Sequence, residues 1–315
     1  MKMRIVIAAL FFTSAIAAQT LQDGRKLLLS QRYRSAKETI EKVVAAAPTN
    51  PEAIYWLAQV NFEAKNPAAA KDVLRKGMEG ANGSNPLLLV AMGQAELAEK
   101  KVNDAKQRFE TAISLSKSKD VNILIAIGKA NLEDGGDYAY GIEKLKLATT
   151  LKNFNDPMAF VYMGDLYRKL MDGGGAVSSY ENALLKDPKS AVAKYKIGKV
   201  YLTQGNEQKD IFLGKLNGAI ADDPTFAPAL YELYVYYFFR DVVKATDFFN
   251  KYKTNADAGP ALDYEEASLQ FAAGDFKNAI AKSDALLTAQ GEKADARLYR
   301  LKAVSYTHLT LPTKA

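Results

Sequence analysis

The sequence predicts an all-α fold, a solenoid of about eight helix–turn–helix repeats. The first observation is a small residue that returns every 34 to 36 residues, and the second is another small residue that keeps the same phase. The third is that apolar residues within each period follow the spacing of two helices. The first ladder comprises Ala36, Ala70, Ala105, Gly141, Ala176, Asp210, Ala245 and Ala279, in which Asp210 alone differs in kind. The second ladder comprises Gly24, Ala58, Gly93, Gly128, Gly164 and Gly198.

Residues 157–190 form the clearest repeat. Apolar side chains recur at helical spacing over residues 160–167 and again over 176–184, which predicts two amphipathic helices. The glycines at 173–175 predict the turn between them. The second helix is expected to end before Pro188, because the residue preceding a proline is pushed out of the α region.

Small residues are expected where the two antiparallel helices of a repeat approach each other, because a large side chain there would separate the backbones. Neither helix can bury its apolar stripe alone, so stacked repeats must bury it for one another. The residues predicted to pack the repeats are Gly93, Ala105, Gly128, Gly164, Ala176, Ala183, Pro188 and Gly198.

This pattern resembles the tetratricopeptide repeat (TPR) over residues 20–290. The resemblance implies a right-handed superhelical α-solenoid that binds a partner on the concave face, which the first helix of each repeat (helix A) lines. Leu233 and Ser283 depart from the family pattern, and short insertions are expected at 80–85, 135–136 and 206–209. The matching positions are Phe160, Met163, Gly164 and Tyr167 on helix A, Ala176, Tyr180 and Ala183 on the second helix (helix B), and the closing Pro188.

The two ends are predicted to lie outside the repeat array. Residues 1–18 carry Lys2 and Arg4, then a short apolar core and an Ala-x-Ala site, which is typical of a secretory signal peptide. No cysteine follows that site, and no later stretch is apolar for long enough to span a membrane. We therefore expect an exported bacterial protein, located in the periplasm, with full secretion as the alternative.

Residues 304–315 are similar to the translation of a transposase adapter used in sequencing libraries, and they are interpreted as a non-native tail. Residues 294–303 begin another helix A that finds no helix B. The expected organisation is therefore a signal peptide at 1–18, an array at 19–303 of about eight repeats plus the start of another, and a tail at 304–315. On this interpretation the natural protein continues beyond Ala303.

The composition offers little catalytic chemistry. The chain has no cysteine, and its single histidine, His308, lies in the suspected tail. Thiol nucleophiles, histidine triads and common zinc sites therefore lack their residues. The glycines at 173–175 lack a phosphate-loop context, and residues 133–137 lack the alternating oxygen ligands of a calcium loop. No enzyme activity, cofactor or metal is expected, and a net charge of +6 with scattered lysines does not indicate nucleic acid binding.

Candidate partner-binding residues occupy the exposed helix-A positions that the resemblance implies. They either bind a partner or contact the next repeat, whereas the aliphatic residues of the same row are expected to contact the next repeat. Lys129 and Lys199 lack the asparagines of the family's carboxylate clamp, so clamping of a C-terminal carboxylate is not predicted. The candidates are Tyr55, Gln59, Gln94, Lys129, Asp165, Tyr195, Lys199 and Tyr234.

Two further aromatic features are interpreted as packing. The dense aromatic run at 231–239 is expected to form a rigid core in the middle of the array, any exposed remainder being a partner site. Trp56 is expected in the seam between repeats.

Three functions are compatible with this organisation. The first is a non-enzymatic scaffold of the cell envelope that holds a peptide or partner protein of unknown identity in the concave groove. The second is an N-terminal adaptor of a longer enzyme or envelope-anchored protein, whose further domain follows Ala303. The third is an array that self-associates through its unfinished C-terminal repeat, since an unfinished repeat end exposes an apolar face.

Overall fold

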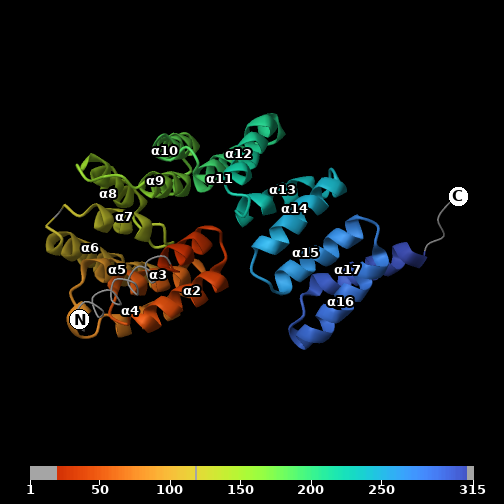
Figure 1. Cartoon of the computed structure of the whole chain (residues 1–315), viewed down its shortest axis with the longest axis horizontal. Coiled ribbons are helices and arrows are strands. Elements are labelled where there is room, and N and C mark those ends of the chain that lie inside the picture. Colours follow the sequence, from red (N-terminus) through yellow and green to blue (C-terminus); the bar gives the residue numbers. More distant parts are fainter. Residues whose placement is uncertain (1–19, 118, 311–315) are drawn as a thin grey trace, which may run out of the picture. The chain divides into compact units, whose positions relative to one another are not determined.

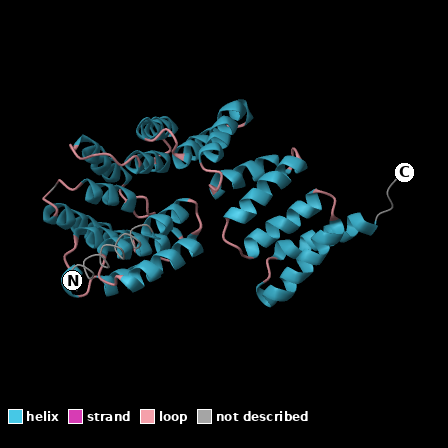
Figure 2. Cartoon of the chain, in the orientation of Figure 1, coloured by secondary structure: helices cyan, strands magenta, loops and turns pink. Residues whose placement is uncertain are grey.

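The computed structural model describes residues 20–117 and 119–310, and within them all regular structure is helical (Figures 1 and 2). The predicted signal peptide and residues 311–315 lie outside the described residues. The chain divides into two compact units, Met1–Lys215 and Leu216–Ala315, which are taken separately below.

Unit 1 consists of successive helix pairs, in each of which a helix A is followed by a helix B, and α3 with α4, α5 with α6, α7 with α8 and α9 with α10 lie side by side (Figure 1). Short 3₁₀ turns at η1 (Gly80–Asn82) and η2 (Asn206–Gln208) occupy two of the predicted insertions. The pairs are residues 20–29 with α2 (Tyr33–Ala46), α3 (Pro51–Glu63) with α4 (Pro67–Gly77), α5 (Pro86–Ala98) with α6 (Val102–Leu115), α7 (Val121–Ala130) with α8 (Tyr138–Thr150), and α9 (Met158–Lys169) with α10 (Gly173–Lys186). The sixth pair is α11 (Ala191–Leu202) with α12 (Lys209–Asp222), and the boundary of the unit falls within α12.

Unit 2 continues the same arrangement of helix pairs. It contains α13 (Ala227–Phe238) with α14 (Val242–Asn255), α15 (Pro260–Ala272) with α16 (Phe276–Gln290), the short η3 (Gly291–Lys293), and α17 (Ala296–Thr310). The all-α solenoid of two-helix repeats predicted from the period is therefore confirmed in both units.

Polar caps set where the helix-A segments of unit 1 begin. The Asn50 side chain accepts hydrogen bonds from the backbone N–H groups of Glu52 and Ala53 at 3.0 and 3.2 Å. Asn85 and Asp120 cap α5 and α7 in the same way. Each cap satisfies N–H groups that have no partner inside the helix, so a polar residue recurs at the start of these helices.

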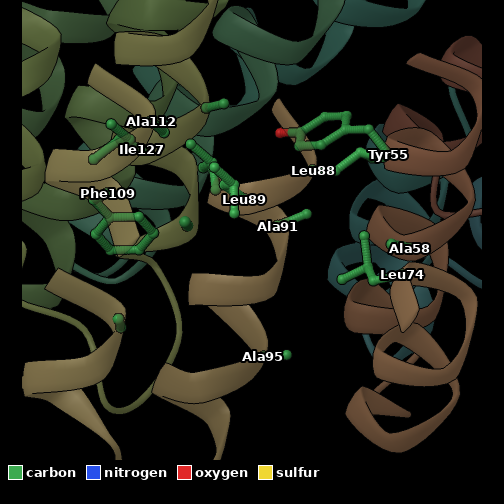
Figure 3. Packing of buried hydrophobic residues seen from close by; sticks show 14 of the residues in the cluster. Tyr55, Ala58, Leu74, Leu88, Leu89, Ala91, Ala95, Phe109, Ala112 and Ile127 are labelled. Carbon is green, nitrogen blue, oxygen red and sulfur yellow. The ribbon is translucent and has the colours of Figure 1, made fainter. Parts of the chain in front are cut away.

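The small residues of helix A contact large residues of helix B. A Cβ atom added to Gly93 would lie 2.5 Å from the Phe109 ring, and one added to Gly164 would lie 2.4 Å from the Tyr180 ring. Gly128 has the same relation to Leu145. Figure 3 shows part of the resulting core, in which side chains of α3 to α7 interdigitate. Of the other packing residues, Ala105, Ala176, Ala183 and Gly198 are buried and Pro188 follows the end of α10 in an exposed position.

One prediction about the turns is wrong. The glycines at 173–175 do not form the turn between α9 and α10, because they are the first three residues of α10. The turn lies at 170–172, and the Asp172 carboxylate caps α10 by accepting the N–H of Gly175 at 2.8 Å. Glycine at 175 allows this close capping, since a Cβ there would lie 2.6 Å from the Asp172 carboxylate and 2.8 Å from the Tyr167 ring.

The first ladder is also out of register in the sixth repeat. Asp210 is exposed, and the buried stripe of α12 consists of Phe212, Leu216 and Ala219. These residues repeat the spacing of Ala176, Tyr180 and Ala183 in α10. The inserted η2 segment shifts the start of α12 by two residues, so Phe212 occupies the place that the constant step gives to Asp210.

The aromatic run at 231–239 is only partly a core. Leu233 and Tyr234 are buried, but Phe239 is 90% exposed and Val235 is 44% exposed. A helix-A residue that departs from the family pattern, Leu233, is thus accommodated in the interior. In α16, Ser283 is fully buried and its hydroxyl donates to the backbone carbonyl of Ala279 at 2.7 Å.

Helix α17 does not end at the suspected junction after Ala303. It continues to Thr310, and Ser305 within it is fully buried. The His308 ring stacks on Phe276 with ring centroids 5.1 Å apart. These residues are therefore packed as a helix, and their origin stays a prediction.

Candidate functional site

Unit 1 contains a cavity of about 360 Å³ on its helix-A face. Arg25 of the first repeat and Asp156, which precedes the fifth helix A, line the same space. Because residues of repeats one and five meet there, the helix-A face of unit 1 must be concave. The other main contributors are Tyr55 and Trp56 from α3, Leu87 from α5, Ile123, Ile125 and Lys129 from α7, and Met158 and Tyr162 from α9.

One wall of the cavity is an aromatic and cationic stack. The Arg25 guanidinium lies 4.4 Å from the centre of the Trp56 ring, a cation–π distance. Trp56 in turn packs edge-on against Tyr55, with centroids 5.2 Å apart. Arg25 also lies 3.7 Å from the Glu52 carboxylate at the exposed edge. Trp56 is half-buried and packs against the cores of neighbouring repeats, as expected for a residue in the seam between repeats. It also lines the cavity.

The floor of the cavity carries two phenol groups. Tyr55 is 5% exposed and Tyr162 is 8% exposed. Burial raises the pKa of both hydroxyls well above the usual tyrosine range, and the nearby Arg25 charge offsets part of that rise. Both groups therefore remain protonated at physiological pH. Among the described residues, neither hydroxyl has a hydrogen-bond partner.

Beneath the floor lies a buried polar network centred on Lys129. Its ammonium group donates to the Gln59 side-chain oxygen at 2.5 Å and to Glu63 at 3.0 Å. Gln59 donates to Gln94 at 2.8 Å, and Gln94 donates to Glu133 at 2.9 Å. The Lys129 charge holds the pKa of Glu63 below its usual range, against the effect of burial. The network joins repeats two, three and four.

The mouth of the cavity is acidic, but its carboxylates already accept hydrogen bonds. Asp120 caps α7 by accepting from the N–H groups of Asn122 and Ile123. Asp156 accepts from the N–H of Met158 at 2.8 Å. Each carboxylate therefore lies at a helix N-terminus, whose partial positive charge compensates it.

A second, wider hollow of about 730 Å³ adjoins the cavity and shares Arg25, Asp120, Asn122 and Asp156 with it. The remainder of its lining is mostly polar and comes from the loops that precede α7 and α9, with Val121 and Pro157 at the starts of these helices. Those residues include the lysines Lys117 and Lys119 and the amides Asn153 and Asn155. The two hollows form one continuous surface across the helix-A N-termini.

The structure separates the eight predicted binding residues into groups. Tyr55 and Lys129 line the cavity, whereas Gln59 and Gln94 lie in the network below it. Asp165 accepts from the Tyr180 hydroxyl at 2.7 Å and pairs with Lys196 at 2.9 Å. In α11, Tyr195 is buried and Lys199 is half-buried. Tyr234 lies in unit 2, where it is buried and donates to Glu265 at 2.8 Å.

Sequence reasoning missed Arg25, Trp56 and Tyr162 as members of the site. Trp56 directly follows the candidate Tyr55, and Tyr162 is at the position of the fifth repeat that corresponds to Trp56. Arg25 lies one period before the candidate Gln59, so the same reasoning applied to the first repeat finds it.

The arrangement is suited to binding. Within the described part of the chain, no cluster of three or more potential metal ligands occurs. In the same residues, no helix combines the length and the apolar character that crossing a bilayer requires. The cavity volume lies within the range of small-ligand pockets, and the mixture of apolar walls and a few polar groups is typical of such sites.

Residues 30–112 match the family described as anaphase-promoting complex, cyclosome, subunit 3. No curated protein matches the chain by sequence. Among solved structures, the Cut9–Hcn1 hetero-tetramer of the APC/C is 12% identical, with a TM-score of 0.50 over 91% of this chain and 55% of that chain. A tetratricopeptide repeat protein of Parabacteroides merdae is 18% identical, with a TM-score of 0.46 over 81% and 98%. YrrB, a TPR protein with an unusual peptide-binding site, is 19% identical, with a TM-score of 0.37 over 62% and 98%. The family match is confined to residues 30–112, and the likeness to Cut9–Hcn1 shows the fold alone.

Proposed function

We propose that the chain is a non-enzymatic scaffold of the bacterial cell envelope, and that it holds a segment of a partner protein on the helix-A face of unit 1. The cavity lined by Arg25, Tyr55, Trp56, Lys129 and Tyr162 is the observation that carries this proposal. Solenoids of this type offer an extended concave surface for partners. The match of residues 30–112 to a subunit of a multi-protein complex is compatible with such a role.

The aromatic wall favours a peptide over a polar solute. Tyr and Trp side chains are enriched where proteins bind one another, because they provide a large contact area with a polar tip. The adjoining hollow carries three asparagines, Asn122, Asn153 and Asn155, whose amides can bond to the backbone of an extended segment. The two hollows together offer room for several residues.

The envelope location rests on the signal peptide predicted at residues 1–18. If the chain is exported, the protein recovered from a periplasmic extract begins at Gln19. Mass spectrometry of the N-terminal peptide measures this directly, and an intact Met1 in the cytoplasmic fraction would contradict it.

Peptide binding can be tested with a random heptapeptide library selected on the purified protein. Trp56 is the single tryptophan of the chain and lines the cavity, so its fluorescence reports binding of each selected peptide. Asn122→Phe places a bulky ring at the exposed mouth and should weaken binding at least tenfold. The control Asn250→Phe makes the same change at an exposed position of α14 and should leave binding unchanged. Failure to select any peptide, or equal binding by the Asn122→Phe variant, would count against the proposed site.

A further inference from the structure

The floor of the cavity is rich in hydrogen-bond donors that lack a protein acceptor. Tyr55 and Tyr162 are more than nine-tenths buried as residues and line the cavity, and no hydrogen bond joins either hydroxyl to another described residue. Neither hydroxyl is among the buried side-chain atoms that lack a partner, so both stay open to the cavity. Two phenol groups that can donate into one cavity therefore point to a ligand that accepts hydrogen bonds.

Two cations face the same space. Lys129 uses two of its three N–H donors, on Gln59 and Glu63, and the residue also lines the cavity. The Arg25 guanidinium carbon lies 4.4 Å from the centre of the Trp56 ring, and among the described residues its ion-pair partner is Glu52, 3.7 Å away at the exposed edge. A guanidinium presents five N–H donors in a planar fork that matches a carboxylate, and the single contact with Glu52 does not use them all.

The acidic residues of the lining lie at the mouth and not on the floor. Glu52 and Asp120 are exposed and Asp156 is half-buried, whereas Tyr55, Lys129 and Tyr162 are buried. The carboxylates of Asp120 and Asp156 each accept backbone N–H groups at a helix N-terminus, whose partial positive charge compensates them. A ligand that places a hydrogen-bond acceptor at the floor of the cavity and N–H donors at its mouth would complement both the buried donors and the exposed carboxylates.

We infer that the cavity receives the side-chain carboxylate of a glutamate or aspartate within an extended segment of the partner protein, bound by the Tyr55 and Tyr162 hydroxyls and by Arg25. This inference rests on the proposed function. A side-chain carboxylate is favoured over a C-terminal one because the cavity continues past Asn122 into the second hollow. From its acidic residue the bound segment can therefore run on into the second hollow, with its backbone N–H groups toward Asp120 and Asp156.

Acetylated and amidated heptapeptides test this inference, because neither end of such a peptide carries a charge. Selection on the full chain should enrich glutamate or aspartate at one position. Changing that residue to its amide should weaken binding to the unaltered protein about tenfold or more, since a charge-assisted hydrogen bond is lost. The double variant Tyr55→Phe, Tyr162→Phe should bind the acidic peptide more weakly than the unaltered protein, by a similar factor.

A double-mutant cycle distinguishes direct contact from a general loss of structure. In the double variant, exchanging the acid for its amide should have little further effect on binding. Tyr138→Phe, which removes a hydroxyl outside the cavity, should bind the acidic peptide like the unaltered protein. Circular dichroism and thermal unfolding check that each variant is folded.

The other outcomes of these experiments contradict either this inference or the proposed function. Selected peptides without an acid, or acidic peptides that the double variant binds equally well, overturn this inference and leave the proposed function standing. A preference for a free C-terminal carboxylate in a second library with unblocked ends overturns the side-chain assignment. Absence of any selected peptide overturns the proposed function and this inference with it.

Discussion

At the scale of single residues, the fold depends on where a side chain is missing. Gly93, Gly128 and Gly164 each lie against a large residue of helix B that fills the place of their absent Cβ. In a helix interior, glycine is unfavourable relative to alanine by roughly 0.5–1 kcal/mol. These positions keep glycine because the close approach of the two helices outweighs that cost.

Substitution of Gly164 with alanine should therefore destabilise the protein. The new Cβ would lie 2.4 Å from the Tyr180 ring, which is fully buried and held by the hydrogen bond of its hydroxyl to Asp165. We expect a loss of about 1–3 kcal/mol in the free energy of unfolding, the usual cost of overpacking. The matched control is Gly214→Ala in α12, where no atom lies within 4 Å of the added Cβ, and this variant should gain about 0.5–1 kcal/mol. Urea unfolding of both variants measures the contrast, and two changes of the same sign would contradict it.

At the scale of helices, the sequence predicts which segments are helical more accurately than it predicts the residues at which each helix begins and ends. Each helix pair of the described residues was foreseen from the period and the apolar spacing, because a two-helix repeat must bury the same stripe at every step. The turn placed at 173–175 was wrong because glycine is permissive and does not by itself fix where a helix begins. The capping carboxylate of Asp172 decides that start, and a capping aspartate can be found in sequence only if the turn is already located.

The register of α12 leads to a second prediction. The place of the small ladder residue in α12 is filled by Phe212, which is 1% exposed, and not by the exposed Asp210. Phe212→Ala should therefore cost about 3–5 kcal/mol in the free energy of unfolding, whereas Asp210→Ala should cost at most about 1 kcal/mol through the loss of a favourable charge in the first helical turn. Thermal and urea unfolding of the two variants decide the register. Comparable losses for both would mean that α12 follows the constant step after all.

At the scale of the molecule, the site depends on contacts between repeats that are not neighbours. Lys129 of the fourth repeat reaches Gln59 and Glu63 of the second, and Arg25 of the first shares a cavity with Asp156 before the fifth. The sequence could nominate Tyr55 and Lys129 because they occupy exposed helix-A positions. It could not show that Lys129 lies over the second repeat, since that depends on the curvature accumulated across several repeats, which one repeat's pattern does not encode.

The link between Lys129 and Glu63 makes the stability of unit 1 depend on pH. Lys129 is buried and holds the pKa of Glu63 below its usual value of 4.5, so the folded state favours the ionised carboxylate more than the unfolded state does. This contribution is fully present above about pH 4.5 and is lost as the pH falls through the lower pKa of the folded state. Lys129→Met should therefore be less stable than the unaltered protein at pH 7, and the difference should shrink toward pH 3. The side chain of Glu63 is 43% exposed, so solvent screening keeps the effect modest.

Lys251→Met, which removes an exposed pairing with Asp247, is the matched control and should show little difference at either pH. A stability gap for Lys129→Met that stays constant from pH 7 to pH 3 would mean that the ion pair does not brace repeats two and four, and that the buried amides of Gln59 and Gln94 hold them together instead.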